Sequence, residues 1–279
     1  MIHTTLVDAA TLARHIGDGE WRLFDVRHQL TDATYGEREY ASGHIPGAVF
    51  LHCDRDLSGP KTGRNGRHPL PDPLKLAAAL AASGVSGASQ VVVYDDTQGM
   101  MAGRLWWMLR WLGHGRVAVL DGGYQAWKAF GGATNCEIPS FPGGNLDVEL
   151  GQCKVDADYV LANLESQEMC LVDARSPDRF RGENETLDPV GGHIPGARNR
   201  FFRDNLAADG KFKPPAVLRN EWEVILDGRP PPCVVHQCGS GISACHNLLA
   251  MEYAGLAGSR LYPGSWSEWC ADLSRPVAK

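Results

Sequence analysis

The 279-residue sequence lacks any apolar run near the roughly 18–20 residues that a membrane-spanning helix needs. Segment 1–21 has no basic stretch followed by a continuous apolar core, so we expect no secretory signal. Positive charge is scarcer than negative charge, because 27 Lys and Arg residues stand against 33 Asp and Glu residues, a formal net charge of −6. This balance argues against nucleic acid or an anionic membrane as partner. An anionic ligand would need a local basic cluster.

The eight cysteines lack the spacing of a disulfide framework, and a chain of this length does not need such cross-links. We therefore expect reduced thiols and a cytoplasmic protein. The sequence also lacks a convincing cluster of metal ligands, and no glycine-rich nucleotide fingerprint follows a predicted strand, so no cofactor is expected. Most of the cysteines are expected to be structural or incidental: Cys53, Cys136, Cys153, Cys170, Cys233 and Cys270.

What the sequence does contain is an internal duplication. Residues 23–48 resemble residues 171–197, and both copies hold an Asp-x-Arg sequence and an identical GHIPGA block. Further along, residues 92–127 align without gaps with residues 234–269. Two long copies indicate a duplicated domain and not an array of short repeats.

Each copy alternates short apolar strands with helical stretches. In the first copy the strands are WRLFDVR, QVVVYDD and VAVLDGG, and the helical stretches between them are PDPLKLAAALAASG and GRLWWMLRWLGH. This alternation predicts an α/β fold in which each copy has a parallel β-sheet flanked by α-helices. We expect an N-terminal domain at residues 1–135, a Pro- and Gly-rich linker at 136–153, and a C-terminal domain at 154–279.

The sequence HQCGSGISACHN places Cys238 in a turn between a predicted strand and a predicted helix. The strand is predicted at residues 233–235, directly after two prolines. Apolar residues recur at helical spacing from position 242 onward and predict the helix. Backbone N–H groups at the start of a helix have no intrahelical partners and favour an anion. The gapless alignment sets Asp96 opposite Cys238, so only the C-terminal copy is expected to carry thiol chemistry.

The residue types of this loop suit a cysteine nucleophile. A thiolate is the reactive form of cysteine, and N–H groups that converge on the sulfur favour it. Gly239 and Gly241 accept the positive φ angles that a tight curl requires. The hydroxyls of Ser240 and Ser243 can donate further hydrogen bonds. The predicted anion cradle consists of Gly239, Ser240, Gly241, Ile242 and Ser243.

The doubled GHIPGA block, VDARSPDRFRG, CGSGISAC and LYPGSWSEW together resemble the tandem-domain rhodanese family over essentially the whole chain. That family comprises thiosulfate and 3-mercaptopyruvate sulfurtransferases. The resemblance implies two rhodanese-like domains, of which only the C-terminal one is catalytic. It also implies that Cys238 takes a sulfur atom from a small anionic donor, holds it as a persulfide, and passes it to a thiol, a thioredoxin-like protein or cyanide.

The resemblance also suggests which residues bind the donor. The family's substrate-binding arginine in an RFxG sequence matches Arg179, and Arg181 is an auxiliary candidate. The 3-mercaptopyruvate branch carries another arginine before the second GHIPGA block, whereas this chain reads ENETLDPVG there. Thiosulfate-preferring members place basic residues after the cysteine, whereas this chain has Gly239 and Ser240. A hydroxyl-lined loop suits a monoanion whose leaving enolate needs a proton, so we expect 3-mercaptopyruvate, with thiosulfate as the alternative donor.

Histidines recur in both GHIPGA blocks, as His44 and His193, so their main role is expected to be structural. His44 is the better functional candidate, because in 3-mercaptopyruvate enzymes the corresponding histidine can face the catalytic serine, here Ser240. The basic loop at 59–73 either borders the site or is solvated, and its candidates are Arg64, Arg67 and His68.

Other interpretations of Cys238 are weaker. A phosphatase of related fold carries Cys-x5-Arg, but the sixth residue after Cys238 is Ala244. A non-catalytic persulfide-binding or redox-sensing module would not need the full set of loop glycines and serines. Cys245 is either a buried packing residue or a resolving thiol. A zinc site would have to combine His236, Cys238, Cys245 and His246 without close ligand pairs.

Overall fold

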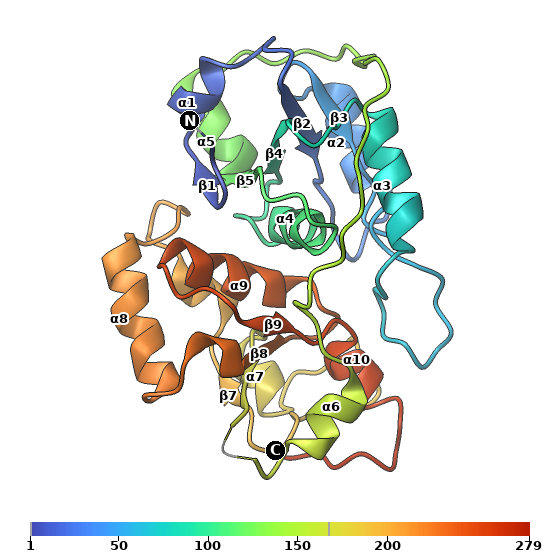
Figure 1. The fold of residues 1–279 in the computed structure, drawn as a ribbon. Helices are drawn as coiled ribbons and strands as arrows, with labels where there is room; N and C mark the ends of the chain where they lie inside the picture. The colour runs from blue at the N-terminus through green and yellow to red at the C-terminus, as the bar shows by residue number, and fades with distance from the viewer. Residues whose placement is uncertain (1, 167) are drawn as a thin grey trace. The chain divides into compact units, whose positions relative to one another are not determined.

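The computed structural model describes residues 2–166 and 168–279. Contacts between Cα atoms divide the chain into two compact units, drawn in Figure 1, and neither unit is continuous in sequence. Unit 1 contains Met1–Gly59, Pro71–Gly151 and Asp209–Lys211, and unit 2 contains Pro60–Leu70, Gln152–Ala208 and Phe212–Lys279. The basic loop Pro60–Leu70 therefore packs with the second unit, although it lies within the first copy of the sequence.

Unit 1 is built on a five-stranded parallel sheet with the strand order β1-β5-β4-β2-β3. Its strands are β1 (Leu6–Val7), β2 (Trp21–Asp25), β3 (Ala48–Phe50), β4 (Gln90–Tyr94) and β5 (Val117–Leu120). Its helices are α1 (Ala9–Ala13), α2 (Tyr35–Ser42), α3 (Pro73–Ala82), α4 (Ala102–Trp111) and α5 (Gly123–Phe130).

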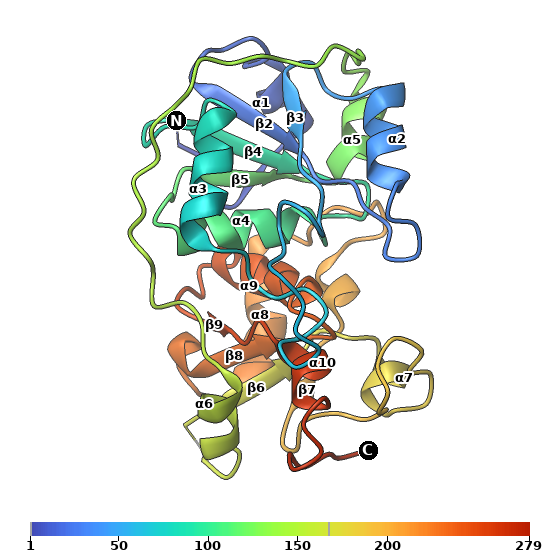
Figure 2. The ribbon, with the colours of Figure 1, turned by 90° about the vertical axis from the view of Figure 1, so that its right-hand side faces the viewer.

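Helices cover both faces of this sheet, as Figure 2 shows. On one face, Leu12 of α1 and Trp127 of α5 pack with inward residues of the strands such as Val92 and Leu120. The helix α4 packs against β4 and β5. Every residue of β4 is buried, as expected for a central parallel strand.

Unit 2 contains a four-stranded parallel sheet with the strand order β7-β6-β8-β9. Its strands are β6 (Cys170–Asp173), β7 (Arg198–Asn199), β8 (Val234–Gln237) and β9 (Arg260–Leu261). Its helices are α6 (Ala157–Ala162), α7 (Pro177–Phe180), α8 (Pro215–Leu226), α9 (Ser243–Tyr253) and α10 (Ser265–Trp269), with 3₁₀ turns at Phe202–Asn205 and Pro231–Cys233.

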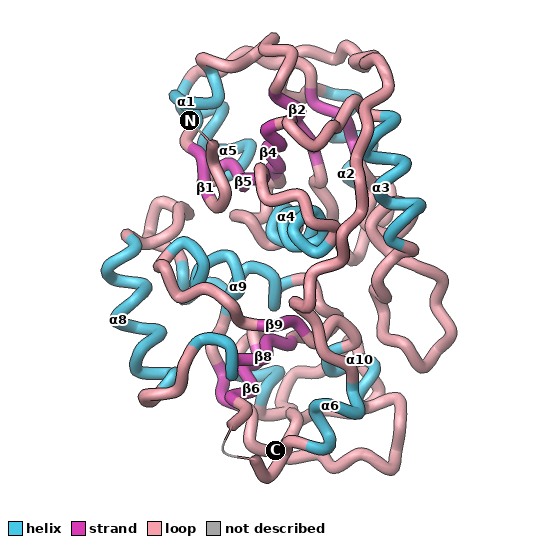
Figure 3. The backbone as a smooth tube through the Cα atoms, in the orientation of Figure 1, coloured by secondary structure: helices cyan, strands magenta, loops and turns pink. Residues whose placement is uncertain are grey.

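The core of unit 2 repeats the plan of unit 1. Val160 of α6 and Trp266 of α10 pack on the sheet with Leu171 and Val235. The helix α9 contacts β8 and β9 and is flanked by α8. The predicted α/β fold with a parallel sheet in each copy is therefore confirmed. Figure 3 shows that the segment 136–153 is a long loop, and no residue of it lies in a named helix or strand.

The Asp-x-Arg and GHIPGA sequences shared by the two copies form the same buried set of hydrogen bonds in each unit. In unit 1, Arg27 Nη2 donates to Asp25 Oδ2 at 2.6 Å and to Gly43 O at 2.8 Å. In unit 2, Arg175 Nη2 donates to Asp173 Oδ2 at 2.6 Å and to Gly192 O at 2.8 Å. Gly192 is the first residue of the second GHIPGA block. The Asp-x-Arg sequence thus holds the GHIPGA turn onto the sheet, which explains why both copies keep both motifs.

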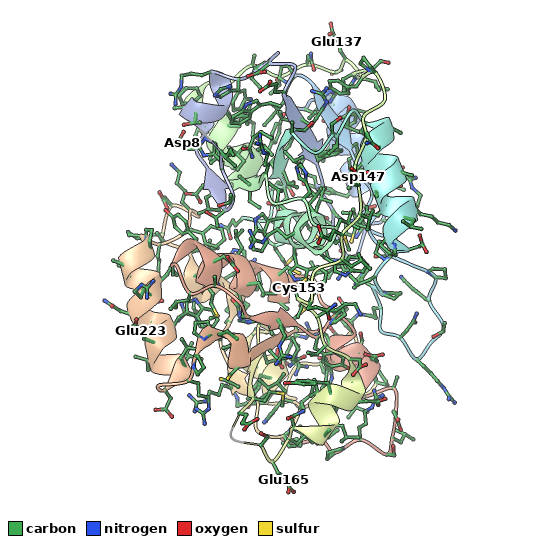
Figure 4. All side chains as sticks on the ribbon, in the orientation of Figure 1. Asp8, Glu137, Asp147, Cys153, Glu165 and Glu223 are labelled. Atoms are coloured by element: carbon green, nitrogen blue, oxygen red, sulfur yellow. The ribbon has the colours of Figure 1, made fainter. Side chains whose placement is uncertain are left out.

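The acidic excess of the sequence lies partly on the surface. The five carboxylates labelled in Figure 4, which are Asp8, Glu137, Asp147, Glu165 and Glu223, are all exposed. Among the described residues, no helix combines the length and the apolar character that crossing a membrane requires.

Candidate functional site

Cys238 follows the last residue of β8 and stands at the head of the loop that enters α9. Only 2% of the residue is exposed. Its backbone is held by the first two residues of α10, because its N–H donates to Ser265 Oγ at 3.1 Å and its carbonyl accepts from Trp266 N at 3.0 Å. Ser265 has a φ of 54°, a left-handed conformation that is uncommon for residues other than glycine and that clusters at functional sites.

The two loop glycines are needed for different reasons. Gly241 has a φ of 76°, and a Cβ at this position would lie 2.3 Å from Pro263 O, so only glycine fits. Gly239 does not have a positive φ, so the expectation of positive φ angles at both glycines is correct only for Gly241. A Cβ at position 239 would instead lie 2.8 Å from Arg67 Nη2. Gly239 therefore leaves room for a guanidinium group.

The strand register shows which residue of unit 1 corresponds to Cys238. Asp25 of β2 pairs with Tyr94, whereas Asp173 of β6 pairs with Gln237. Tyr94 ends β4 and is followed by Asp95, and Gln237 ends β8 and is followed by Cys238. Asp95 therefore corresponds to Cys238. The gapless alignment that set Asp96 opposite Cys238 is thus wrong by one residue, because the loop between strand and helix is longer in unit 1 (residues 95–101) than in unit 2 (residues 238–242).

The loop of unit 1 surrounds a buried carboxyl group with backbone N–H donors. The carboxylate of Asp95 is wholly buried and accepts hydrogen bonds from the backbone N–H groups of Thr97, Gly99, Met101 and Ala102 at 2.8–3.1 Å. The hydroxyl of Thr97 donates a fifth hydrogen bond at 3.0 Å. Burial raises the pKa of Asp95, and the N–H donors act in the opposite direction. The same strand–loop–helix turn, with Cys238 at its head, is therefore suited to an anionic side chain.

A serine and a histidine meet beside this loop. Ser240 Oγ lies 2.8 Å from His68 Nδ1, and the two side chains share a hydrogen bond. Both residues are nearly buried, at 5% and 6% exposure. His68 comes from the loop Pro60–Leu70, so this loop borders the site and is not simply solvated. Ser240 therefore has His68 as its histidine partner.

Arg179 also approaches the loop, whereas Arg181 does not engage it. Arg179 Nη2 would lie 3.4 Å from a Cβ at Gly239, and its guanidinium binds the Glu185 carboxylate through Nε at 3.2 Å and Nη2 at 2.8 Å. Burial opposes ionisation of Glu185, but the hydrogen bonds from Arg179 help to keep the pKa of this carboxyl below its usual value. Arg181 is about half exposed and pairs with Glu183 at the surface. The expectation that Arg181 is an auxiliary anion contact is therefore not supported.

The whole chain is similar to known proteins. A model of the rhodanese-like domain matches the chain twice, at residues 8–130 and 156–272. The chain belongs to the rhodanese family. It is 48% identical to a Pseudomonas aeruginosa protein named "Probable 3-mercaptopyruvate sulfurtransferase", over 100% of this chain and 99% of that protein. It is 33% identical to the thiosulfate sulfurtransferase of Bos taurus, over 96% and 93% of the two chains.

Solved structures agree with this assignment. The structure of a 3-mercaptopyruvate sulfurtransferase from Leishmania major superposes with a TM-score of 0.86 at 30% identity, covering 98% of this chain and 76% of that one. The chain thus consists of two rhodanese domains with parallel sheets flanked by helices.

The histidines of the two GHIPGA blocks act as structural residues in both rhodanese domains. His44 is wholly buried, and its ring nitrogens lie 2.8 Å from Tyr40 O and 2.9 Å from Glu137 O. His193 has the equivalent bond from Nδ1, at 2.9 Å from Phe180 O. Because both His44 nitrogens bind backbone carbonyls of unit 1, the expectation that His44 pairs with Ser240 is wrong.

The remaining residues of the predicted cradle lie where the loop enters α9. Ile242 is 4% exposed and precedes α9, and Ser243 is the first residue of that helix and is half-buried. Cys245 is wholly buried and its thiol donates to Gly241 O at 3.3 Å, which fits the packing role considered for it.

The histidines of the zinc alternative have other neighbours. His236 Nε2 lies 3.2 Å from Met251 Sδ, and the ring of His246 stacks on Phe212. In the part of the chain that the structure describes, no group of three or more His, Cys, Asp and Glu side chains is arranged to hold a metal ion.

The sequence predicts site roles for Cys238, Ser240 and Arg179 but leaves two roles open for Arg67 and His68. The available signal was a basic, Gly- and Pro-rich loop without periodicity. Such a loop gives no indication of which surface it covers, because its position depends on tertiary contacts more than 100 residues away in sequence.

Proposed function

We propose that the chain is a sulfurtransferase that moves a sulfur atom from 3-mercaptopyruvate to a thiol or cyanide through a persulfide on Cys238. The observation that carries this proposal is the pair of equivalent loops. In unit 1 the loop surrounds the carboxylate of Asp95, and in unit 2 the residue in the same register is Cys238. A loop that holds a carboxylate through its N–H groups suits a thiolate or a persulfide equally well.

In the first half-reaction the Cys238 thiolate attacks the sulfur atom of the donor. A sulfur–sulfur bond forms, the carbon–sulfur bond of 3-mercaptopyruvate breaks, and the electron pair of that bond leaves on carbon as the enolate of pyruvate. One proton then converts this enolate into pyruvate. Cys238 retains the transferred sulfur as Cys–S–SH, so the reaction is a covalent double displacement.

Ser240 and His68 are suited to deliver the proton. Their 2.8 Å hydrogen bond links a hydroxyl two residues after the nucleophile to an imidazole, which is the usual proton carrier near neutral pH. In this role the Ser240 hydroxyl donates to the leaving enolate and His68 restores the proton. Arg179, with its guanidinium near Gly239, binds the donor carboxylate. The backbone from Gly239 to Ser243 forms the cradle around the sulfur.

In the second half-reaction an acceptor attacks the outer sulfur of the persulfide. A thiolate acceptor, either a small thiol or a thioredoxin-like protein, leaves with the sulfur as a persulfide, and cyanide leaves as thiocyanate. In both cases the Cys238 thiolate is regenerated, and no external oxidant or reductant is consumed. Because the cycle needs a reduced Cys238, we assign the reaction to the cytoplasm.

Two observations favour 3-mercaptopyruvate over thiosulfate as the donor. The Pseudomonas aeruginosa relative named for the former is 48% identical, against 38% for a Mycobacterium tuberculosis protein named "Putative thiosulfate sulfurtransferase SseB" and 33% for the bovine thiosulfate sulfurtransferase. In addition, the two leaving groups differ in their need for a proton. Sulfite leaves thiosulfate as a stable anion, whereas the enolate that leaves 3-mercaptopyruvate must be protonated on carbon to become pyruvate. The Ser240–His68 pair can supply that proton, which favours 3-mercaptopyruvate as the donor. Thiosulfate is the alternative donor.

The proposal is tested by mixing the purified protein with one donor at a time, without an acceptor, and recording its intact mass. We expect the protein to gain one sulfur atom, with faster gain from 3-mercaptopyruvate. Release of that atom on addition of cyanide, as thiocyanate, would complete the cycle. No gain with either donor would contradict the proposal and favour a non-catalytic module.

A further inference from the structure

The loop Pro60–Leu70 and the segment that follows α10 border a cavity of about 510 Å³ in unit 2. This volume lies within the range of small-molecule sites, roughly 300–1,000 Å³. The lining residues are Arg64, Ala271, Asp272, Leu273 and Arg275. Two arginines and one aspartate give the lining one excess positive charge, although the chain as a whole has a net charge of −6. The proposed function uses none of these residues.

Arg275 is held in a fixed position by its neighbours. Its Nη1 donates to Glu268 O at 2.9 Å, and its Cζ lies 5.5 Å from the centre of the Trp269 ring. Its Nε lies 3.7 Å from Asp272 Oδ2, and only 15% of the side chain is exposed. The guanidinium group is therefore oriented before a ligand arrives, which lowers the entropy cost of binding one.

Asp272 cancels one of the two positive charges. Its Oδ1 accepts hydrogen bonds from Ser274 N at 3.0 Å and from Ser274 Oγ at 2.7 Å. These hydrogen bonds lower the pKa of Asp272, and the charges of Arg275 and Arg64 act in the same direction. Asp272 therefore stays ionised, and the cavity is suited to a ligand with a single negative charge.

Arg64 supplies the charge that is not cancelled. Within residues 2–166 and 168–279, no hydrogen bond or ion pair engages its guanidinium group, which acts on Asp272 only through its charge. The loop around it is fixed, because Asn65 Oδ1 accepts from Thr62 N at 2.9 Å and Asn65 Nδ2 donates to Pro60 O at 2.9 Å. Arg64 is thus an available cation on an ordered loop.

The cavity lies one short helix away from Cys238. Ser265 and Trp266, the first two residues of α10, hydrogen-bond the backbone of Cys238. Ala271 follows Trp266 by five residues, which is roughly 8 Å along a helix. The same loop that carries Arg64 is also fastened to α10, because the backbone N–H of residue 67 donates to Ser267 Oγ at 3.0 Å. A group bound in the cavity would therefore lie on the order of 10 Å from the nucleophile.

We propose that this cavity binds the carboxylate of the sulfur acceptor between Arg64 and Arg275, so that small anionic thiols are the preferred acceptors. This site presupposes the proposed sulfur transfer, because it serves the second half-reaction. In that step the acceptor thiolate attacks the outer sulfur, a sulfur–sulfur bond forms on the acceptor, the bond to Cys238 breaks, and the Cys238 thiolate leaves. In a short peptide, a cysteine thiol and a carboxylate on the next residue are roughly 7 Å apart, which fits this spacing.

The test follows the discharge of a persulfide formed beforehand with 3-mercaptopyruvate, after the excess donor has been removed. The acceptors are the peptide N-acetyl-Cys-Gly and its C-terminal amide, which differ only in the carboxylate. Loss of sulfur is read from the intact mass and gives a second-order rate constant for each acceptor. The variants are Arg64→Ala, Arg64→Glu and Arg275→Ala. The matched control is Lys61→Ala, because Lys61 is exposed on the same loop but does not line the cavity.

We expect Arg64→Ala to lower the rate constant for the acid about three- to fivefold, as for one exposed charge contact, and Arg64→Glu to lower it further. We expect a loss of about tenfold for the more buried Arg275→Ala. The rate constant for the amide should stay the same in these variants, and Lys61→Ala should match the wild type with both acceptors. In the wild type, added salt should lower the rate constant for the acid and not that for the amide.

The two proposals fail in different ways. If the wild type gains no sulfur from either donor, the proposed function falls. If the wild type forms the persulfide but both Arg64 variants discharge it to the acid as fast as the wild type does, the acceptor site is overturned and the proposed function stands. Equal losses with acid and amide, or an equal loss in Lys61→Ala, would also overturn it. If Arg275→Ala does not fold, the exposed Arg64 still decides.

Discussion

Replacing Asp95 by asparagine tests whether the loop between β4 and α4 of unit 1 requires an anion. Asparagine keeps one carbonyl oxygen but carries an NH2 group in place of the other, so two of the four bound N–H groups lose their acceptor, for example those of Met101 and Ala102. An unsatisfied buried donor costs about 1–3 kcal/mol, or about 2–6 kcal/mol for two. Because burial raises the pKa of Asp95, removing the charge recovers part of this cost. We expect a net loss of about 2–4 kcal/mol.

The assay is urea unfolding followed by tryptophan fluorescence, with hydrogen exchange at the amides of Met101 and Ala102 as a local readout. Asp96→Asn is the control, because Asp96 accepts a hydrogen bond from the Tyr35 hydroxyl and none from the loop amides. We expect the control to change the unfolding free energy much less than Asp95→Asn. If Asp95→Asn unfolds like the wild type and exchanges no faster at these amides, the argument that the loop holds an anion is refuted for both units.

Three further predictions concern the second unit. Ser240→Ala and His68→Asn should each lower kcat with 3-mercaptopyruvate about 10²-fold, as for a lost general acid, and should lower kcat with thiosulfate far less; equal losses would remove the pair from proton transfer. Arg179→Ala should raise the donor KM about tenfold or more, whereas Arg181→Ala should leave it unchanged, because of these two arginines Arg179 approaches the loop and Arg181 pairs with Glu183 at the surface. Desolvation lowers the pKa of the wholly buried His236 to about 3. Between about pH 6.5 and pH 3 this histidine is therefore protonated in the unfolded chain and neutral in the folded chain, so the free energy of unfolding falls as the pH drops through that range. His236→Gln should make the unfolding free energy less steep over that range, by up to about 1.4 kcal/mol per pH unit, and an unchanged slope in urea titrations would contradict this.

The fold and the central residue of the site follow from local patterns. Alternating apolar strands and helices predict the two parallel sheets, and the strand–loop–helix sequence around Cys238 places it at a helix N-terminus. Both patterns depend on neighbouring residues, so a single sequence contains them.

Two features of the site are not local. The register that matches Cys238 with Asp95 depends on pairing with β6 and β2, and a gapless alignment hides the longer loop of the first copy. The partners His68 and Arg67 depend on where an aperiodic loop packs. That packing rests on close approaches such as Gly66 against Gly264, which no spacing rule predicts.

The proposed sulfur transfer depends on Cys238 as the residue that carries the sulfur. The most direct measurement is the intact mass of the wild type and of Cys238→Ser after incubation with 3-mercaptopyruvate alone. We expect the wild type to gain one sulfur atom, which cyanide removes, and Cys238→Ser to gain none while keeping the same unfolding profile. A sulfur gain in Cys238→Ser would contradict the account, because the persulfide would then lie on another cysteine.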